Sequence, residues 1–141
     1  MAPAHFFVVA ALVTATPPSP LRAVERAAFR ISLPAFTALA SSERRDRRLD
    51  WSSDGCSAPV VGGTGRSFDF TDACRRHDFG YRNYKALDDG RHWNERIRRR
   101  IDDKFKSDMM STCASRRRTM RTTCRAWALT FFRAVRTWGG S

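Results

Sequence analysis

The sequence predicts an all-α fold of about five helices, stapled by two disulfides. Apolar residues recur at helical spacing along several stretches, and no strand pattern of comparable strength is present. Four cysteines provide for two bridges, and 141 residues give room for one domain. A hydrophobic content of 42% is enough for a core and excludes wholesale disorder.

The N-terminal segment resembles a secretory signal peptide. An apolar run from Phe6 to Val13 is followed by small residues at plausible cleavage positions. Residues 1–20 are therefore expected to be signal peptide and linker, and 21–141 the folded domain. The segment before the apolar run has His5 but no Lys or Arg, so an apolar N-terminal helix or a misplaced start codon stays open. No stretch approaches the roughly 20 apolar residues that a spanning helix needs.

Two short helices are expected next. Residues 21–33 carry apolar residues at helical spacing, and Pro34 is expected to stop that helix, because proline removes a backbone donor. A second short helix is expected over 35–40. The charged run 43–48 is typical of a solvated turn.

A loop and a longer helix follow. Residues 52–67 contain glycines and a proline that favour turns. Thr71 is expected to cap a helix that runs to about Leu87. Residues 88–90, Asp-Asp-Gly, are expected to end it as a turn.

Two further helices are expected in the second half, each with one apolar stripe. The first stripe consists of Trp93, Ile97, Ile101, Phe105 and Met109. The second consists of Cys124, Trp127, Ala128, Phe131, Ala134, Val135 and Trp138. Gly139 and Gly140 are expected to end the last helix. Tryptophans 93, 127 and 138 are expected in the core rather than at a membrane.

Positive charge is concentrated in the last third of the chain. The formal net charge is +12, and residues 91–141 contribute +10 of it, with 14 basic and 4 acidic residues. Such a field suits an anionic membrane surface or a nucleic acid equally well. The arginine runs 98–100 and 116–118 are either solvated faces or contacts to anionic headgroups.

The cysteines favour a disulfide framework. Four cysteines allow three pairings, and the pairing Cys56–Cys74 with Cys113–Cys124 is favoured because each bridge joins neighbouring segments. In the chain-entropy model, each bridge is worth roughly 3 kcal/mol. A zinc site is disfavoured, because no Cys or His pair has ligand spacing.

His77 is the candidate general base. It is followed by Asp78 on the expected helix, and adjacent helical side chains point about 100° apart. Asp102 borders the stripe at Ile101, where a partly buried carboxylate could accept the other imidazole N–H and fix the tautomer. Water activated by His77 is a simpler nucleophile than Ser57, which lacks a serine-elbow context.

Asp54, Gly55 and Asp78 are candidate ligands for calcium. Calcium takes about six to eight oxygens from carboxylates, carbonyls and water. Asp54 and Asp78 supply carboxylates and Gly55 a backbone carbonyl, if a Cys56–Cys74 bridge holds the loop against the helix. Zinc is disfavoured, because the cluster offers oxygens and one histidine.

These motifs resemble the prokaryotic and fungal secreted phospholipase A2 family. The likeness covers roughly residues 49–139, including 51–57, 68–70, 100–102 and the apolar positions of the last helix. Its most specific part is the run His77-Asp78-Phe79-Gly80-Tyr81-Arg82-Asn83-Tyr84.

The resemblance implies a secreted, calcium-dependent enzyme with the phospholipase A2-like fold, which cleaves the sn-2 ester of glycerophospholipids. It implies His77 as base, Asp102 as its partner, and Asp54, Gly55 and Asp78 as calcium ligands. It implies the cysteine pairing favoured above and a supporting hydrogen bond from Tyr81. The expected partner is a phospholipid membrane surface, anionic in character, and the expected state is a monomer; a nucleic acid is disfavoured.

Two features depart from the family pattern. The glycine-rich segment 62–66 replaces a loop expected to be rich in Pro and Asn, and the last third is unusually rich in arginine. Two alternatives therefore stay open. One is a non-catalytic basic module that binds anionic lipid or nucleic acid, and the other is a metal-dependent nuclease.

Overall fold

The computed structural model describes residues 15–56 and 68–139. Within these ranges the protein is all-α, as predicted, with no strand. The helices are α1 (Pro20–Glu25), α2 (Leu33–Ala40), α3 (Thr71–Ala86), α4 (Glu95–Ala114) and α5 (Arg121–Trp138). A π-helical turn (Arg26–Arg30) extends α1, and 3-10 turns lie at Leu87–Gly90 and Arg118–Met120. The expected signal peptide and the glycine-rich segment 62–66 lie outside the described residues.

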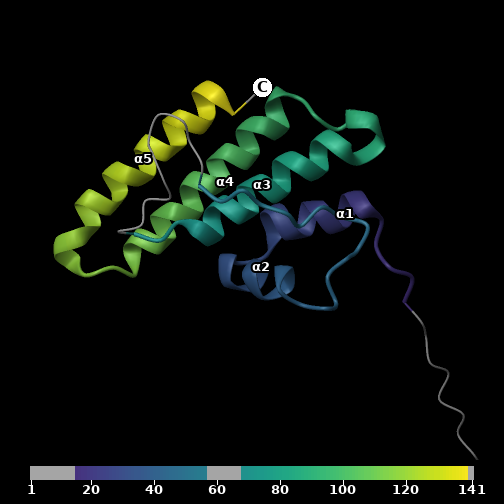
Figure 1. The fold of residues 1–141 in the computed structure, drawn as a ribbon, viewed down its shortest axis with the longest axis horizontal. Helices are drawn as coiled ribbons and strands as arrows, with labels where there is room; N and C mark the ends of the chain where they lie inside the picture. Colours follow the sequence, from purple (N-terminus) through teal and green to yellow (C-terminus); the bar gives the residue numbers. More distant parts are fainter. Residues whose placement is uncertain (1–14, 57–67, 140–141) are drawn as a thin grey trace, which may run out of the picture.

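The three long helices form the body of the molecule (Figure 1). α4 lies between α3 and α5 and packs extensively on both. α1 and α2 lie on the other side of α3 (Figure 1). α3 and α4 run antiparallel because the short turn 87–94 joins them. Residues of α3 therefore face residues of α4 that are distant in the sequence.

Pro34 does not stop the first helix, contrary to the sequence prediction. The helical segment ends at Arg30, and Pro34 lies in the first turn of α2. Ser32 caps that turn, because its Oγ accepts from the backbone N of Ala35 at 3.3 Å. Proline is compatible with a first turn, where the missing N–H would have no helical partner. Pro20 likewise lies in the first turn of α1, directly after the cap residue Ser19.

The ends of α3 and α4 also differ from the prediction. Thr71 is the first residue of α3 rather than its cap, and the capping position belongs to Phe70. The turn at 88–90 is confirmed, with Asp88 and Asp89 at positive φ. α4 begins after Asn94, whose side chain accepts from the backbone N of Ile97 at 3.0 Å.

Both disulfides have the predicted pairing. Cys56–Cys74 ties the segment 49–56, hereafter the strap, to the first turns of α3. Cys113–Cys124 joins the end of α4 to the start of α5. The two bridges therefore hold the strap and α5 around the helix pair α3–α4.

The apolar stripes form the core, with one correction. Ile101, Phe105 and Met109 of α4 are buried, as are Cys124, Ala128, Phe131 and Ala134 of α5. Trp127 and Trp138, predicted in the core, are 40% and 51% exposed. Trp127 lies at the edge of the α5 stripe, and Trp138 is the last residue of the helix.

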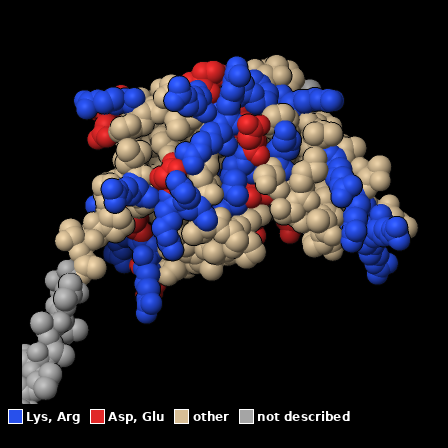
Figure 2. Space-filling model, turned by 180° about the vertical axis from the view of Figure 1, so that it is seen from behind, with Lys and Arg blue, Asp and Glu red and all other residues tan. Residues whose placement is uncertain are grey.

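Basic side chains are spread over the surface. On the face shown in Figure 2, Lys and Arg cover much of the area, and fewer Asp and Glu lie between them. An exception is Arg76, which is buried and forms a two-pronged ion pair with the buried Asp108. This pair joins α3 to α4 inside the protein.

Candidate active site

His77 on α3 and Asp102 on α4 face each other where these helices pack. His77 Nε2 lies 2.8 Å from Asp102 Oδ1, and Asp102 is fully buried. They are 25 positions apart in the sequence. Because an ionised carboxylate only accepts, the Nε2–H of His77 is the donor, which leaves Nδ1 as the nitrogen that can take a proton.

Asp78 points away from the His77–Asp102 pair and toward the strap. Its Oδ2 accepts from Ser53 Oγ at 2.6 Å and from the backbone N of Asp54 at 3.0 Å. His77 instead turns to α4. The adjacent side chains His77 and Asp78 therefore contact different elements, α4 and the strap, as their helical spacing predicted.

The Asp102 carboxylate accepts from three side chains. Tyr81 Oη donates to Oδ1 at 2.8 Å, and Arg136 Nη1 donates to Oδ2 at 2.7 Å, in addition to His77. Burial by itself raises the pKa of Asp102, but the hydrogen bonds from His77, Arg136 and Tyr81 outweigh burial and hold that pKa below its ordinary value. The sequence anticipated Tyr81 and missed Arg136, because no motif distinguishes Arg136 from the other arginines of α5.

Two aromatic rings enclose the imidazole of His77. The ring centroids of Tyr81 and Phe105 lie 4.4 and 4.8 Å from that of His77. Burial, and then the hydrogen bond to ionised Asp102, raises the pKa of Tyr81, so its hydroxyl stays a donor. The imidazole therefore has a polar edge at Asp102 and an apolar enclosure around its faces.

The strap presents the other candidate ligands beside Asp78. Asp54 is largely exposed, and its Oδ2 accepts from Arg82 Nη2 at 2.7 Å. Arg82 Nη1 also donates to Ser52 Oγ at 2.9 Å. Gly55 has φ +74°, a backbone conformation that glycine adopts without strain. This turn lets the strap pass Asp78 and reach the Cys56 bridge.

Asp54, Gly55 and Asp78 are the described residues whose oxygens could hold a calcium ion. Asp54 and Asp78 offer carboxylate oxygens and Gly55 a carbonyl oxygen, the ligands that a hard cation takes. In the described part of the chain, no group of three or more His, Cys, Asp or Glu side chains could hold a metal ion. Calcium bound here would take the two carboxylates and the carbonyl together with further oxygen ligands.

A pocket of about 220 Å³ opens beside His77. Gly55, Asp78 and Arg82 line it on the polar side. Its apolar wall consists of Phe105, Phe131 and Val135. One pocket therefore joins the imidazole of His77, the carboxylate of Asp78 and an apolar surface.

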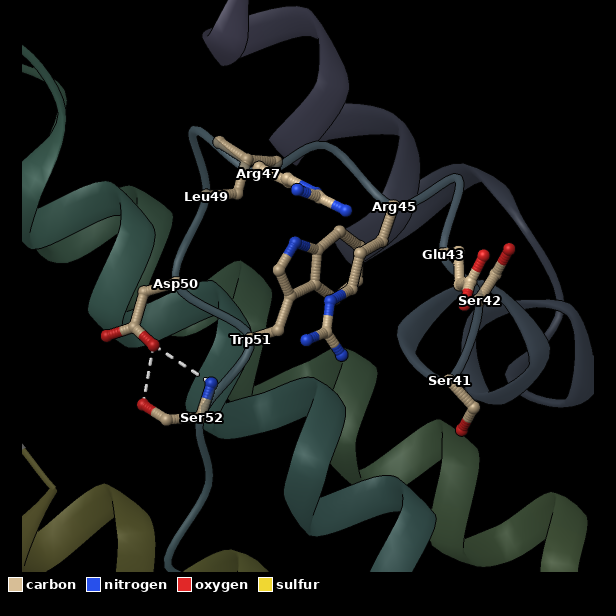
Figure 3. Close-up of a pocket in the computed structure, with 9 residues that line it drawn as sticks. All are labelled: Ser41, Ser42, Glu43, Arg45, Arg47, Leu49, Asp50, Trp51 and Ser52. Carbon is tan, nitrogen blue, oxygen red and sulfur yellow. Dashed lines mark hydrogen bonds between the residues drawn. The ribbon is translucent and has the colours of Figure 1, made fainter.

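A larger hollow of about 610 Å³ lies between the end of α2 and residues 43–52 (Figure 3). Its polar groups are used to hold the local backbone. Asp50 accepts from the hydroxyl and the backbone N of Ser52, as Figure 3 shows, and Arg45 Nη1 donates to the carbonyl of Ala40 at 2.8 Å. None of the predicted site residues lines this hollow. The predicted site residues His77, Asp78 and Gly55 line the smaller pocket instead.

Comparisons with known proteins point to one family. A sequence model of the family described as prokaryotic phospholipase A2 matches residues 24–139. That range contains the His77–Asp102 pair, the strap and both disulfides.

Two fungal proteins named secretory phospholipase A2 are similar to the chain. The protein from Beauveria bassiana is 37% identical over 116 residues, which is 82% of this chain and 57% of the relative. The protein from Arthroderma benhamiae is 38% identical over 90 residues, which is 64% of this chain and 57% of the relative. The matched part thus spans a little over half the length of each relative.

Proposed function

The chain belongs to the prokaryotic phospholipase A2 family, and from this premise we propose that it hydrolyses the sn-2 ester of glycerophospholipids with calcium as cofactor. The observation that carries the proposal is the His77–Asp102 pair, whose histidine shares one pocket with Asp78 and an apolar wall. A base, a cation-binding carboxylate and an apolar surface suit a substrate that has an ester, a phosphate and an acyl chain.

His77 moves the proton in this mechanism. Water attacks the carbonyl carbon of the ester while Nδ1 of His77 takes a proton from it, and Asp102 stabilises the imidazolium that forms. The tetrahedral adduct then breaks its bond to the glycerol oxygen, and His77 returns the proton to that oxygen. A fatty acid and a lysophospholipid leave, and His77 is neutral again.

Asp54, the carbonyl of Gly55 and Asp78 would hold the calcium ion. When bound, calcium supplies positive charge for the substrate phosphate and the ester carbonyl oxygen, an effect worth several kcal/mol. Ser53 and the backbone N of Asp54 keep Asp78 oriented toward the strap. Asp54 would exchange its exposed ion pair with Arg82 for the cation, and such surface pairs contribute little.

α5 is the element that we propose to contact the lipid surface. Among the described residues, all exposed large apolar side chains belong to α5 or precede it directly. They are Met120, Trp127, Leu129 and Trp138. No Asp or Glu occurs after position 108, whereas arginine recurs throughout. Tryptophan and arginine on one helix suit the headgroup zone of an anionic membrane, and α5 also supplies part of the pocket wall.

The described helices give no candidate membrane span, since none is long and apolar enough. We propose that the protein is secreted and that residues 1–20 are signal peptide and linker. The relatives' names include the word secretory, and two disulfides suit an oxidising compartment. The proposed division at residue 20 falls at the first turn of α1.

Fatty-acid release tests the proposal. Oxidised, folded protein is mixed with vesicles of phosphatidylcholine and phosphatidylglycerol, with calcium and then with a chelator. Release that needs calcium is expected, and His77→Asn is expected to abolish it while keeping the fold and calcium binding. Full activity of His77→Asn would show that His77 is not the general base. No release by the wild-type protein would contradict the proposed function and favour a basic binding module.

A further inference from the structure

The guanidinium of Arg136 bridges two carboxylates of α4. Its Nη1 donates to Asp102 Oδ2 at 2.7 Å, and its Nη2 donates to Glu95 Oε1 at 2.8 Å. Glu95 and Asp102 are two helical turns apart, so they lie on one face of α4. The planar fork of arginine can hold both at once, which a lysine cannot do.

The main chain of Arg136 is also held by α4. Arg98 Nη2 donates to the carbonyl of Arg136 at 2.6 Å and to that of Val135 at 3.3 Å. These carbonyls lie in the last turn of α5. The carbonyl of Val135 also accepts from the backbone N of Gly139 at 2.8 Å. A cation at this end also suits the helix dipole. Because both its main chain and its side chain are fixed, Arg136 presents the guanidinium to Asp102 in a defined position.

We propose that Arg136 is a positioning residue that holds the Asp102 carboxylate in the orientation required by His77. Asp102 is fully buried, and its oxygens have separate partners: Oδ1 accepts from His77 and Tyr81, Oδ2 from Arg136. Of these three donors, only Arg136 carries a positive charge at all times. Without it, Oδ2 would be buried without its partner and the carboxylate could rotate away from His77.

Arg136 acts through Asp102 rather than on the substrate. It does not line the pocket, although its neighbour Val135 and Gly139, directly after α5, do. Its loss should therefore lower kcat and leave KM nearly unchanged, since the substrate-binding surface stays in place. The kinetic part of the test rests on the proposed function, whereas the NMR part does not.

The test compares Arg136→Gln with wild type and with Arg133→Gln, a matched change at an exposed arginine of α5. A short-chain phospholipid below its micelle concentration serves as substrate, so membrane binding does not enter. For Arg136→Gln, kcat is expected to fall roughly 10-fold to 100-fold, a part of what a well-placed base contributes. Arg133→Gln should keep the wild-type kcat. Proton NMR supplies a second measurement, the downfield resonance of the His77 Nε2–H bound to Asp102, which Arg136→Gln should weaken or remove.

Wild-type kcat and an unchanged Nε2–H resonance in Arg136→Gln would overturn the inference. If Arg136→Gln does not fold, Arg136→Lys replaces it, because an ammonium group reaches one carboxylate at a time. Its kcat and resonance should both fall below wild type, and wild-type values for both would overturn the inference. A wild-type protein that releases no fatty acid contradicts the proposed function instead, and the resonance still tests the position of Asp102.

Discussion

Gly80 on α3 and Ile101 on α4 are in direct contact where the two helices pack. A Cβ at Gly80 would lie 3.1 Å from Ile101 Cγ2 and 3.2 Å from two other atoms of that side chain. His77 lies one turn before Gly80, and Asp102 directly follows Ile101. The close approach at Gly80 therefore sets the helix separation beside the His77–Asp102 pair.

Gly80→Val should separate the helices. Overpacking of this contact is expected to lower the free energy of unfolding by about 1–3 kcal/mol, measured by urea denaturation. kcat should fall as well, because His77 moves away from Asp102. Adding Ile101→Ala makes room for the valine, so the double variant should lose less stability than the sum of the single losses. Additive losses would show that the contact does not set the separation.

Much of this fold follows from local patterns in the sequence. The stripe through Ile101, Phe105 and Met109 predicts α4 because its residues recur every four positions and are buried together. The prediction that Pro34 ends the first helix is wrong, because proline is compatible both with the end of one helix and with the first turn of the next. The prediction that Trp127 lies in the core is wrong, because periodicity indicates which side of a helix is apolar and not how much of that side the neighbouring helix covers.

Only part of the candidate site could be predicted from the sequence. His77 and Asp78 are neighbours, so helix geometry alone indicates that they diverge. Arg136 reaches Asp102 from 34 positions away, and only the packing of α5 on α4 brings them together. No local pattern marks this contact, because Arg136 is one of 26 Lys and Arg residues.

Calcium binding should depend on Asp78 and be opposed by Arg82. Asp78→Asn removes a carboxylate and is expected to abolish calcium binding in isothermal calorimetry. Arg82→Gln removes the cation that competes for Asp54, so calcium should bind about twofold to fivefold more tightly. Equal affinity of Asp78→Asn and wild type would place the cation elsewhere. Weaker binding by Arg82→Gln would mean that Arg82 organises the strap.

Vesicle binding should depend on the exposed tryptophans of α5. Removing both indoles in Trp127→Ala/Trp138→Ala is expected to weaken binding to phosphatidylglycerol vesicles roughly tenfold or more, measured by sedimentation. Stability should fall by about 1–3 kcal/mol in total and the fold should be kept, because about half of each side chain is buried. Wild-type vesicle affinity in the double variant would exclude this face of α5 as the docking surface.

The buried ion pair Arg76–Asp108 should contribute strongly to stability. Arg76 also donates to the carbonyl of Ile31 at 2.7 Å, so it links α3, α4 and the segment before α2. Asp108→Ala leaves a buried guanidinium without its carboxylate and should cost about 3–5 kcal/mol in urea unfolding. Replacing both by Met and Leu should cost less, because no charge remains buried. A larger loss in the double variant would contradict this account.

Glu95 should make stability depend on acid pH. Hydrogen bonds from Arg136 and then Arg99, with the charge of Arg98 nearby, lower the pKa of Glu95 from 4.5 to about 2. A carboxyl group with a depressed pKa in the folded protein binds protons more readily when unfolded, so its stabilising effect is present above pH 4.5 and is lost between pH 4.5 and about 2. Glu95→Gln cannot titrate. Its unfolding midpoint in urea should therefore fall less than that of wild type across this interval, and parallel losses in the two proteins would show that the Glu95–Arg136 bridge does not persist in solution.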